Sequence, residues 1–215
     1  DKMKFNYNNY IKILENIEKK KKIAKIIAIS KNHPKEAVIE ALKKGIRVFG
    51  ENRVQEALAK FDDLKKEYPD IKLHFTGNLQ TNKIKQAISL FDSFHTLYKE
   101  KQLIEFAKYP NQILNKEFFI QVNTGFEETK GGLLPQEIEE FIKISSNKYN
   151  IKLAGLMSIP PINENPKKHF MLLKKIKKKL NLKKLSMGMS NDYEQAIDCD
   201  SDYLRIGTLI FGERS

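Results

Sequence analysis

A lysine stands at the end of a strongly apolar segment near the start of this chain. Residues 26–31 read Ile-Ile-Ala-Ile-Ser-Lys, which predicts a strand buried on both faces, as in a parallel sheet. Partial burial near other cations lowers the pKa of a lysine amine, and the neutral amine attacks carbonyl groups to form a Schiff base. Lys31 is therefore a candidate for covalent ligand binding. The alternative is a side chain that extends past the strand end to solvent.

Two glycine-containing segments near the end of the chain carry residue types that bind phosphate. Residues 186–190 read Ser-Met-Gly-Met-Ser, and Gly207-Thr208 follows further on. Glycines let the backbone approach a phosphate closely, and hydroxyls add hydrogen-bond donors. A lysine together with a phosphate site predicts a phosphorylated carbonyl ligand, either pyridoxal phosphate (PLP) or the substrate of a class I-type aldolase. The alternative is two ordinary turns with Ser190 as a helix cap.

Arg205, one of only four arginines, lies just before the second of these segments. If its guanidinium faced a pyridine nitrogen, its permanent positive charge would keep that nitrogen unprotonated. The ring would then be a poorer electron sink, which favours a simple proton transfer, or binding alone, over extensive carbanion chemistry. The commoner fate of an isolated arginine is a surface ion pair, which contributes little stability.

Eight apolar, β-branched segments alternate with amphipathic stripes along the sequence. This alternation predicts a parallel sheet covered by helices, and eight strands are the number that closes a TIM barrel. An open, doubly wound sheet is the alternative, because the sequence does not show closure. A helix over residues 8–20 is expected to precede the barrel. The predicted strands are residues 23–30, 46–50, 71–76, 93–97, 117–123, 152–159, 183–187 and 203–206.

In a TIM barrel the functional residues gather at the carboxyl ends of the strands. Lys31 and Asn52 follow the first two predicted strands, and Arg205 lies at the end of the eighth. The predicted barrel would therefore bring residues that are far apart in the sequence to one rim.

Length and composition fit one cytoplasmic α/β domain over residues 1–215. With 40% hydrophobic residues, the chain can build one large core. Cys199 is its single cysteine, so no intrachain disulfide is expected, which suits a reducing compartment. No segment approaches the ~20 apolar residues of a membrane span, and no membrane partner is expected.

The net charge of +12 does not by itself indicate nucleic-acid binding. Only four of the 39 basic residues are arginine, the residue that reads bases and clamps phosphates with forked hydrogen bonds. The lysines of residues 174–179 accompany an apolar stripe at helical spacing, so they form the solvated face of a helix. No dedicated nucleic-acid function is expected. The four histidines lie far apart without a cysteine or carboxylate frame, so no metal site is expected.

Several short sequence blocks occur in order along the chain and nearly span it, from about residue 11 to residue 212. They are Ile29-Ser30-Lys31, Phe49-Gly50-Glu51-Asn52 with Val54-Gln55-Glu56, His74-Phe75 with Gly77 and Leu79-Gln80, Leu185-Ser186-Met187-Gly188-Met189-Ser190, and Arg205-Ile206-Gly207-Thr208 with Ile210-Phe211-Gly212. Together they resemble the pyridoxal phosphate homeostasis protein family, which looks like the barrel domain of alanine racemase standing alone. The Ser-Met-Gly-Met-Ser and Arg-Ile-Gly-Thr blocks are the most specific.

The resemblance implies a PLP site in which Lys31 is the catalytic residue and holds the cofactor as a Schiff base. It also implies that Arg205 faces the pyridine nitrogen and that Asn52 lies near the ring and its phosphate side. The remaining implied contacts are Ser186, Gly207 and Thr208 at the phosphate, and Met157 and Met187 at the ring.

Two loops depart from the family pattern. The Lys-Ser-Gly that follows the fifth strand in the family is Lys-Gly-Gly at residues 130–132 here, so a hydroxyl is lost. The His-Thr/Ser-x-Asp pattern that follows the fourth strand reads His-Thr-Leu-Tyr at residues 95–98, so an acid is missing. Neither change touches the implied cofactor contacts.

The sequence favours a PLP carrier without robust turnover over an enzyme. A racemase of the alanine type needs two bases, a lysine and a tyrosine that comes from a second, β-rich domain. The sequence ends at Ser215, soon after the eighth predicted strand, so we expect no such domain. One positioned base contributes about 10²–10⁴-fold in rate. An amino-acid racemase is the main alternative, and a Schiff-base aldolase is less favoured. The expected partners are PLP and apo forms of PLP-dependent enzymes, and the expected state is a monomer.

Overall fold

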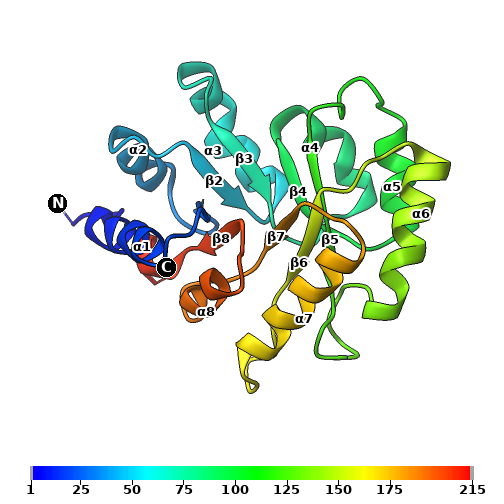
Figure 1. The fold of residues 1–215 in the computed structure, drawn as a ribbon. Helices are drawn as coiled ribbons and strands as arrows, with labels where there is room; N and C mark the ends of the chain where they lie inside the picture. The colour runs from blue at the N-terminus through cyan, green and yellow to red at the C-terminus, as the bar shows by residue number, and fades with distance from the viewer. Residues whose placement is uncertain (1, 214–215) are drawn as a thin grey trace.

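A closed barrel of eight parallel strands forms the centre of the computed structural model, which describes residues 2–213 (Figure 1). Each strand pairs with the next along the chain, and β8 pairs with β1. This closure confirms the predicted TIM barrel and excludes an open sheet. The strands are β1 Lys25–Ile29, β2 Val48–Glu51, β3 Lys72–Phe75, β4 Ser93–Leu97, β5 Glu117–Val122, β6 Gly155–Ser158, β7 Lys184–Ser186 and β8 Tyr203–Ile206.

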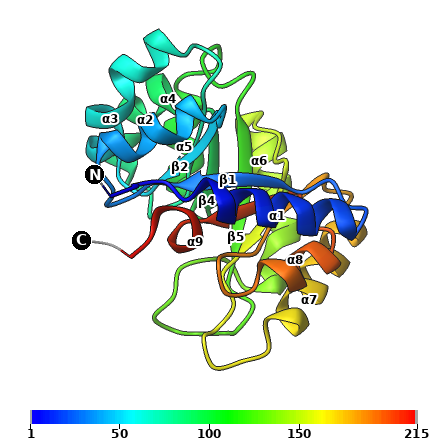
Figure 2. The same cartoon turned by 90° about the vertical axis from the view of Figure 1, so that its left-hand side faces the viewer.

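Helices surround the barrel and connect its strands (Figures 1 and 2). The helix predicted over residues 8–20 is confirmed as α1, which precedes the barrel. The helices are α1 Tyr7–Lys19, α2 Lys35–Lys43, α3 Val54–Glu67, α4 Ile84–Leu90, α5 Glu100–Ala107, α6 Ile138–Tyr149, α7 Pro166–Lys179, α8 Tyr193–Asp198 and α9 Thr208–Phe211, with short 3₁₀ turns at Thr81–Lys83 and Pro135–Glu137.

The leading helix α1 packs against the last elements of the chain (Figure 2). The amide nitrogen of the Asn9 side chain donates to the backbone oxygen of Leu209 at 2.7 Å. The backbone N–H of Asn6 donates to the oxygen of Ile210 at 2.6 Å. These bonds fix α9, which only Gly207 separates from β8, against the N-terminal segment.

Two apolar layers form the core. The larger lies between the strands and the helices, and the smaller fills the barrel interior around Ile27, Phe119 and Met157. Gly155 shows how closely two strands approach, because a Cβ atom there would lie 1.9 Å from the backbone oxygen of Lys184. A larger residue at this position would push β6 away from β7.

Several strands are shorter than the apolar segments that predicted them. Strand β6 was expected over residues 152–159 and comprises Gly155–Ser158. Ile151 and Leu153 lie before it, unpaired in the ladder but buried. Burial selects apolar residues whether or not their backbone pairs with another strand, so the sequence pattern extends beyond the ladder.

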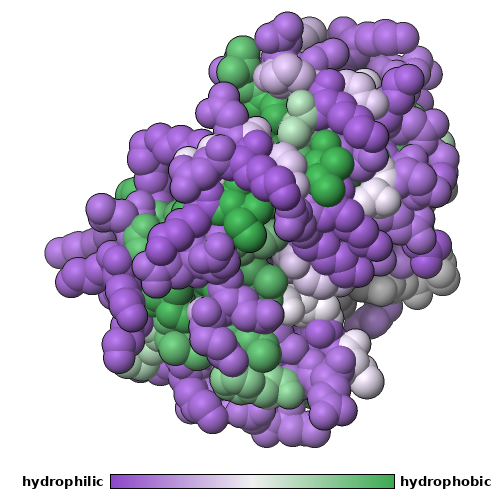
Figure 3. Space-filling view, turned by 90° about the vertical axis from the view of Figure 1, so that its right-hand side faces the viewer, coloured by the Kyte–Doolittle hydropathy of each residue, from purple (hydrophilic) through white to green (hydrophobic). Residues whose placement is uncertain are grey.

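The lysine-rich helix α7 buries only His169, Phe170 and Leu173. The face of the molecule seen from the right of Figure 1 is mostly hydrophilic, with scattered hydrophobic patches (Figure 3). The lysines of α7 therefore form a solvated face, as predicted. Within residues 2–213, no helix is both long enough and apolar enough to cross a bilayer.

Candidate functional site

A cavity of about 1260 Å³ opens at the carboxyl ends of the strands. The loops after β5 and β6 extend together beyond the strands at this end (Figure 2), and a Cβ on Gly125 would lie 2.3 Å from Pro161. Residues from the ends of seven strands line the cavity. Five of the predicted site residues are on its wall, namely Lys31, Asn52, Arg205, Gly207 and Thr208.

Lys31 lies two residues after the end of β1, in a turn that the buried Ser30 helps to hold in place. The backbone N–H of the fully buried Ser30 donates to the oxygen of Gly50 at 3.0 Å, which extends the pairing of β1 with β2. Asn32 has φ 64°, a left-handed conformation that asparagine adopts more readily than most residues. The turn thus places the half-buried Lys31 at the rim, on the cavity wall.

Arg205 reaches the cavity from within the barrel and is only 4% exposed. Its Nη1 donates to the backbone oxygen and the Oγ of Ser186, at 2.8 and 2.7 Å, and its Nη2 donates to the backbone oxygen of Ser158 at 2.9 Å. Burial lowers the pKa of Arg205 to about 10, so the guanidinium stays charged at neutral pH. Arginine has five N–H donors, so donors remain for a ligand. A surface ion pair, the alternative for this residue, is excluded.

Beneath Arg205, two histidines continue a hydrogen-bonded chain through the barrel interior. Ser186 Oγ lies 2.8 Å from His95 Nδ1, and His95 Nε2 lies 2.9 Å from His74 Nδ1. Burial lowers the pKa of His74 to about 4 and holds the pKa of His95 well below its usual value. Both rings are therefore neutral at neutral pH, and the chain supports Arg205 without adding a second positive charge. His74 is thus a buried histidine with a hydrogen-bond partner.

Polar side chains on the loops after β2 and β7 present donors to the cavity. Thr76 Oγ1 donates to Asn52 Oδ1 at 2.6 Å, which leaves the amide nitrogen of Asn52 to donate elsewhere. Ser190 Oγ accepts the backbone N–H of Leu209 at 3.2 Å, which leaves its hydroxyl proton for a ligand. Both Asn52 and Ser190 line the cavity.

Three predicted contacts lie away from the cavity wall. Ser186 is fully buried below Arg205, and Met157 lies in the apolar cluster of the barrel interior. Met187 belongs to the outer core between strands and helices. Ser186 and Met187 face opposite sides because side chains alternate along a strand. Of the predicted cradle at residues 186–190, Met189 and Ser190 are the residues that line the cavity.

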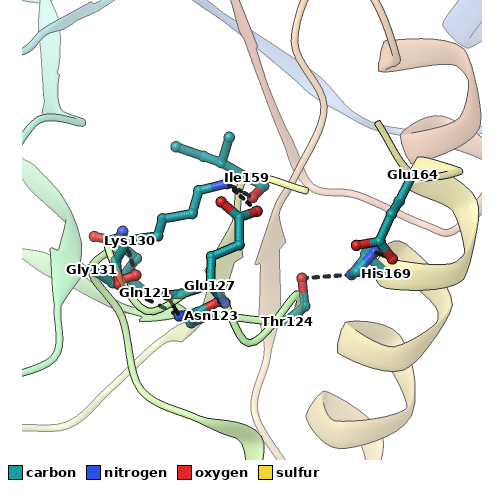
Figure 4. Close-up of polar contacts among 9 residues, drawn as sticks. All are labelled: Gln121, Asn123, Thr124, Glu127, Lys130, Gly131, Ile159, Glu164 and His169. Carbon is teal, nitrogen blue, oxygen red and sulfur yellow. Dashed lines mark hydrogen bonds and ion pairs between the residues drawn. The ribbon is translucent and has the colours of Figure 1, made fainter. Parts of the chain in front are cut away.

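The loops after β5 and β6 form another part of the cavity wall (Figure 4). Lys130 Nζ donates to the backbone oxygen of Ile159 at 2.5 Å and lies 3.6 Å from Glu127 Oε1. The side-chain amide of Asn123 donates to the backbone oxygen of Glu127 at 2.8 Å. The Lys130 amine thus ties one loop to the other.

A buried histidine joins the same two loops to α7 (Figure 4). His169 is 2% exposed; its Nδ1 lies 2.8 Å from Thr124 Oγ1 and its Nε2 lies 3.2 Å from Glu164 Oε1. Thr124 follows β5, and Glu164 lies in the loop after β6. Within residues 2–213, no three histidine, cysteine or acidic side chains gather as around a metal ion.

This chain is similar to known proteins in both sequence and fold. It matches the family model for the alanine racemase N-terminal domain over residues 2–215. It is 41% identical to the pyridoxal phosphate homeostasis protein of Aquifex aeolicus, over 89% of this chain and 87% of that one. For the protein of the same name from Vibrio cholerae, the identity is 38%, over 88% and 85%. The chain belongs to the pyridoxal phosphate homeostasis protein family.

Solved structures similar to this family member agree with that assignment. PipY of Synechococcus elongatus without PLP has a TM-score of 0.81 and 32% identity, over 88% of this chain and 93% of that chain. PipY with PLP bound has a TM-score of 0.76 and 29% identity, over 93% and 100%. Alanine racemase from Acinetobacter baumannii, at 19% identity and a TM-score of 0.69, shares the fold over 91% of this chain and 58% of that chain.

Sequence reasoning missed some residues that build the site of this homeostasis-family chain. Thr76 is the last residue of the third predicted strand, which places it at the rim, but the sequence does not show its bond to Asn52. His95 was noted only as part of a loop pattern, whereas its side chain meets Ser186 inside the barrel. No local signal reveals that meeting, because the two residues are 91 positions apart.

Proposed function

We propose that this chain binds PLP in the rim cavity and serves PLP homeostasis by holding the cofactor on Lys31. The observation that carries the proposal is that one cavity wall brings together Lys31, Arg205 and Ser190, which come from the ends of β1, β8 and β7. The names of the curated relatives and the PLP bound in PipY support it.

The groups on the cavity wall fit this cofactor. When bound, PLP supplies three groups: an aldehyde, a pyridine ring and a phosphate. The aldehyde condenses with a lysine amine to form a Schiff base. Lys31 would hold the aldehyde carbon, and the donors that Arg205 retains would face the ring nitrogen. Asn52, Ser190, Gly207 and Thr208 would hold the ring and the phosphate.

Arg205 and the two histidines below it determine what the site does to a ring nitrogen. The buried guanidinium only donates hydrogen bonds, so a nitrogen that faces it accepts one and carries no proton. His95 and His74 are neutral at neutral pH and lie beneath Arg205, not at the cavity wall. The arrangement therefore favours holding the cofactor over stabilising a carbanion on it.

The cavity wall also favours a carrier over a racemase. Racemisation of the alanine type needs a tyrosine as a second base, and no tyrosine of residues 2–213 lines the cavity. Tyr7 and Tyr10 stack on each other along α1, and Tyr98 packs beside Gly131. The hypothesis of a Schiff-base aldolase gains no support, since no group that lines the cavity favours an aldolase over a PLP-binding protein.

We further propose that residues 1–215 act as one PLP-binding domain, in the cytoplasm and as a monomer that releases PLP to apo forms of PLP-dependent enzymes. One closed barrel contributes all the groups named above, so the site needs no residue from a second copy. The single cysteine, Cys199, suits a reducing compartment.

The test is an absorbance spectrum of the purified protein with PLP, before and after borohydride, with the labelled peptide identified by mass spectrometry. We expect a visible band that borohydride removes, together with a stable adduct on Lys31. Alanine racemisation assayed on the same sample should be weak or absent. No band and no adduct would overturn the PLP proposal, whereas rapid racemisation would overturn only the carrier assignment.

A further inference from the structure

A buried lysine on α3, outside the cavity wall, lies at the centre of a compact group of oxygen atoms. The Lys60 side chain is 8% exposed. Its Nζ donates to the backbone oxygen of Ser30 at 2.6 Å and to Glu51 Oε2 at 2.9 Å, and it lies 2.9 Å from Glu56 Oε2. A lysine ammonium has three donors, so these three oxygens satisfy it completely.

Two of these oxygens bear directly on the residues that flank Lys31. Ser30 precedes Lys31, and its carbonyl accepts from Lys60. Asn32 follows Lys31, and its backbone N–H donates to Glu56 Oε2 at 2.6 Å. Lys60 therefore holds the chain before Lys31 directly and the chain after it through Glu56.

The third oxygen ties the same group to the neighbouring strand. Glu51 ends β2 and is fully buried, and the hydroxyl of Ser30 donates to the same Oε2 atom that Lys60 contacts. Among the described residues, the other oxygen, Oε1, is buried without a hydrogen-bond partner. Burial raises the pKa of Glu51, while the nearby Lys60 acts against that rise. A carboxylate in this position depends on the cation beside it.

We propose that Lys60 is a positioning residue for Lys31: with Glu51 and Glu56 it fixes the backbone on both sides of Lys31 and so sets where the Lys31 amine lies relative to the cavity. This inference rests on the proposed role of Lys31 in PLP binding. The left-handed Asn32 belongs to the same arrangement, because the bond from its backbone N–H to Glu56 fixes the sharp turn at that residue.

Loss of the Lys60 ammonium should misplace the Lys31 amine without removing it. The carbonyl of Ser30 would lose its charged donor, and the two carboxylates would repel each other and release Asn32. Misplacement of a reacting group by about 1 Å costs up to about 100-fold in rate. Covalent capture should therefore suffer much more than non-covalent binding of the cofactor's ring and phosphate, which other residues hold.

The chain offers a matched control on the same helix. Lys65 Nζ donates to the backbone oxygen of Leu90 at 2.7 Å and to Asp92 Oδ2 at 3.1 Å. It thus joins a carbonyl and a carboxylate as Lys60 does, but it touches neither neighbour of Lys31. Lys60→Met and Lys65→Met each remove a lysine ammonium that bonds to a carbonyl and a carboxylate, but only Lys60 lies beside the chain that carries Lys31.

The experiment compares Lys60→Met and Lys65→Met with the unaltered chain in three measurements. The first is the rate at which the Lys31 amine is reductively methylated in the PLP-free protein, followed by mass spectrometry across a pH series. The second is the rate of covalent PLP capture. The third is the affinity for pyridoxine 5′-phosphate, which lacks the aldehyde and reports non-covalent binding alone.

For Lys60→Met we expect covalent capture slowed by about tenfold or more, a displaced pH profile of Lys31 methylation, and pyridoxine phosphate affinity within about threefold of the unaltered chain. Lys65→Met should match the unaltered chain in all three. Equal methylation profiles and capture rates for the two variants would overturn the inference. If Lys60→Met does not fold, Glu56→Ala provides the test: slowed capture supports the inference, and unchanged capture overturns it.

The methylation measurement needs no cofactor, so it separates this inference from the proposed function. If the unaltered chain forms no PLP adduct, the proposed function fails, yet the Lys31 profile still reports whether Lys60 positions the amine. If the adduct forms on Lys31 equally fast in every variant, the proposed function stands and the role of Lys60 fails.

Discussion

The cavity has two sides that are held in different ways. On the β1 side, formed by the ends of β8, β1 and β2, a buried bond from Lys60 holds the carbonyl of Ser30, and Arg205 is anchored inside the barrel. On the β5 side, formed by the loops after β5 and β6, the amine of Lys130 itself holds the neighbouring loop at Ile159. Phe126 and Ile162 on these loops are 60% and 99% exposed.

The firmer hold on the backbone makes the β1 side of the cavity better suited to covalent chemistry than the β5 side. A reacting amine needs a backbone held in one position, and on the β1 side the buried, hydrogen-bonded Ser30, Glu51 and Lys60 hold it. On the β5 side the buried His169 bonds to Thr124, but Lys130 and Glu127 form a partly exposed pair 3.6 Å apart, which contributes little stability. Loops held in this way can rearrange around a ligand with little loss of stability.

The largest expected effect distinguishes the two lysines of the cavity. Lys31→Ala should abolish the borohydride-stable PLP adduct, while Lys130→Ala should retain it on Lys31. Both variants should keep the fold, because each side chain lies at the rim. Mass spectrometry of borohydride-treated samples makes the measurement. An adduct of unchanged yield in Lys31→Ala would show that the β1 side does not carry the covalent bond.

The next effect concerns the anchored guanidinium. Arg205→Ala should weaken PLP retention about 10- to 100-fold and change the absorption spectrum, since the ring nitrogen loses its partner. It should also lower the free energy of unfolding by about 1–3 kcal/mol, because the buried oxygens of Ser186 and Ser158 lose their donor. Dialysis of the loaded protein and urea unfolding make the two measurements. Unchanged retention and spectrum would place the ring away from Arg205.

A smaller effect is the pH dependence of stability that arises from His74, one of the two histidines beneath Arg205. The pKa of His74 is about 4 in the folded chain against 6.5 for an unperturbed histidine, so between these values the unfolded chain binds more protons. Stability should therefore fall as pH drops from 6.5 to 4, with roughly 3 kcal/mol attributable to His74. His74→Gln, which can still bond to His95, should lose the part of this dependence that is due to His74 and keep the part due to His95, whose pKa is also lowered by burial; urea unfolding across that range measures both. An equally steep fall in the variant would assign the dependence to other groups.

The smallest effect is expected on the β5 side. Phe126 has φ 54°, a left-handed conformation that costs a phenylalanine about 1 kcal/mol or more. Phe126→Asn should therefore raise the free energy of unfolding by up to about 1 kcal/mol, and PLP capture should stay within about twofold of the unaltered chain. Thermal unfolding and the capture rate make the comparison. A large loss of capture would mean that the β5 side is as demanding as the β1 side.

The rim residues differ in how far the sequence could place them. Lys31, Arg205 and Thr208 could be placed because each lies at or just after a strand whose apolar pattern is clear, and strand ends share a rim in a parallel barrel. The sequence could not show whether Ser186 or Ser190 lines the cavity, since that depends on the residue at which β7 ends. The structure ends β7 at Ser186 and turns that side chain inward, toward Arg205.

The eight-fold alternation, the lysine at the first strand end and the family can all be read from the sequence, because periodic burial and short motifs are local properties. The folded chain is needed to see that His95 meets Ser186 inside the barrel, and that Lys60 on α3 contacts Ser30 directly and Asn32 through Glu56. Such contacts depend on barrel register and on helix placement against the strands. These are set by packing over the whole chain, and no short segment records them.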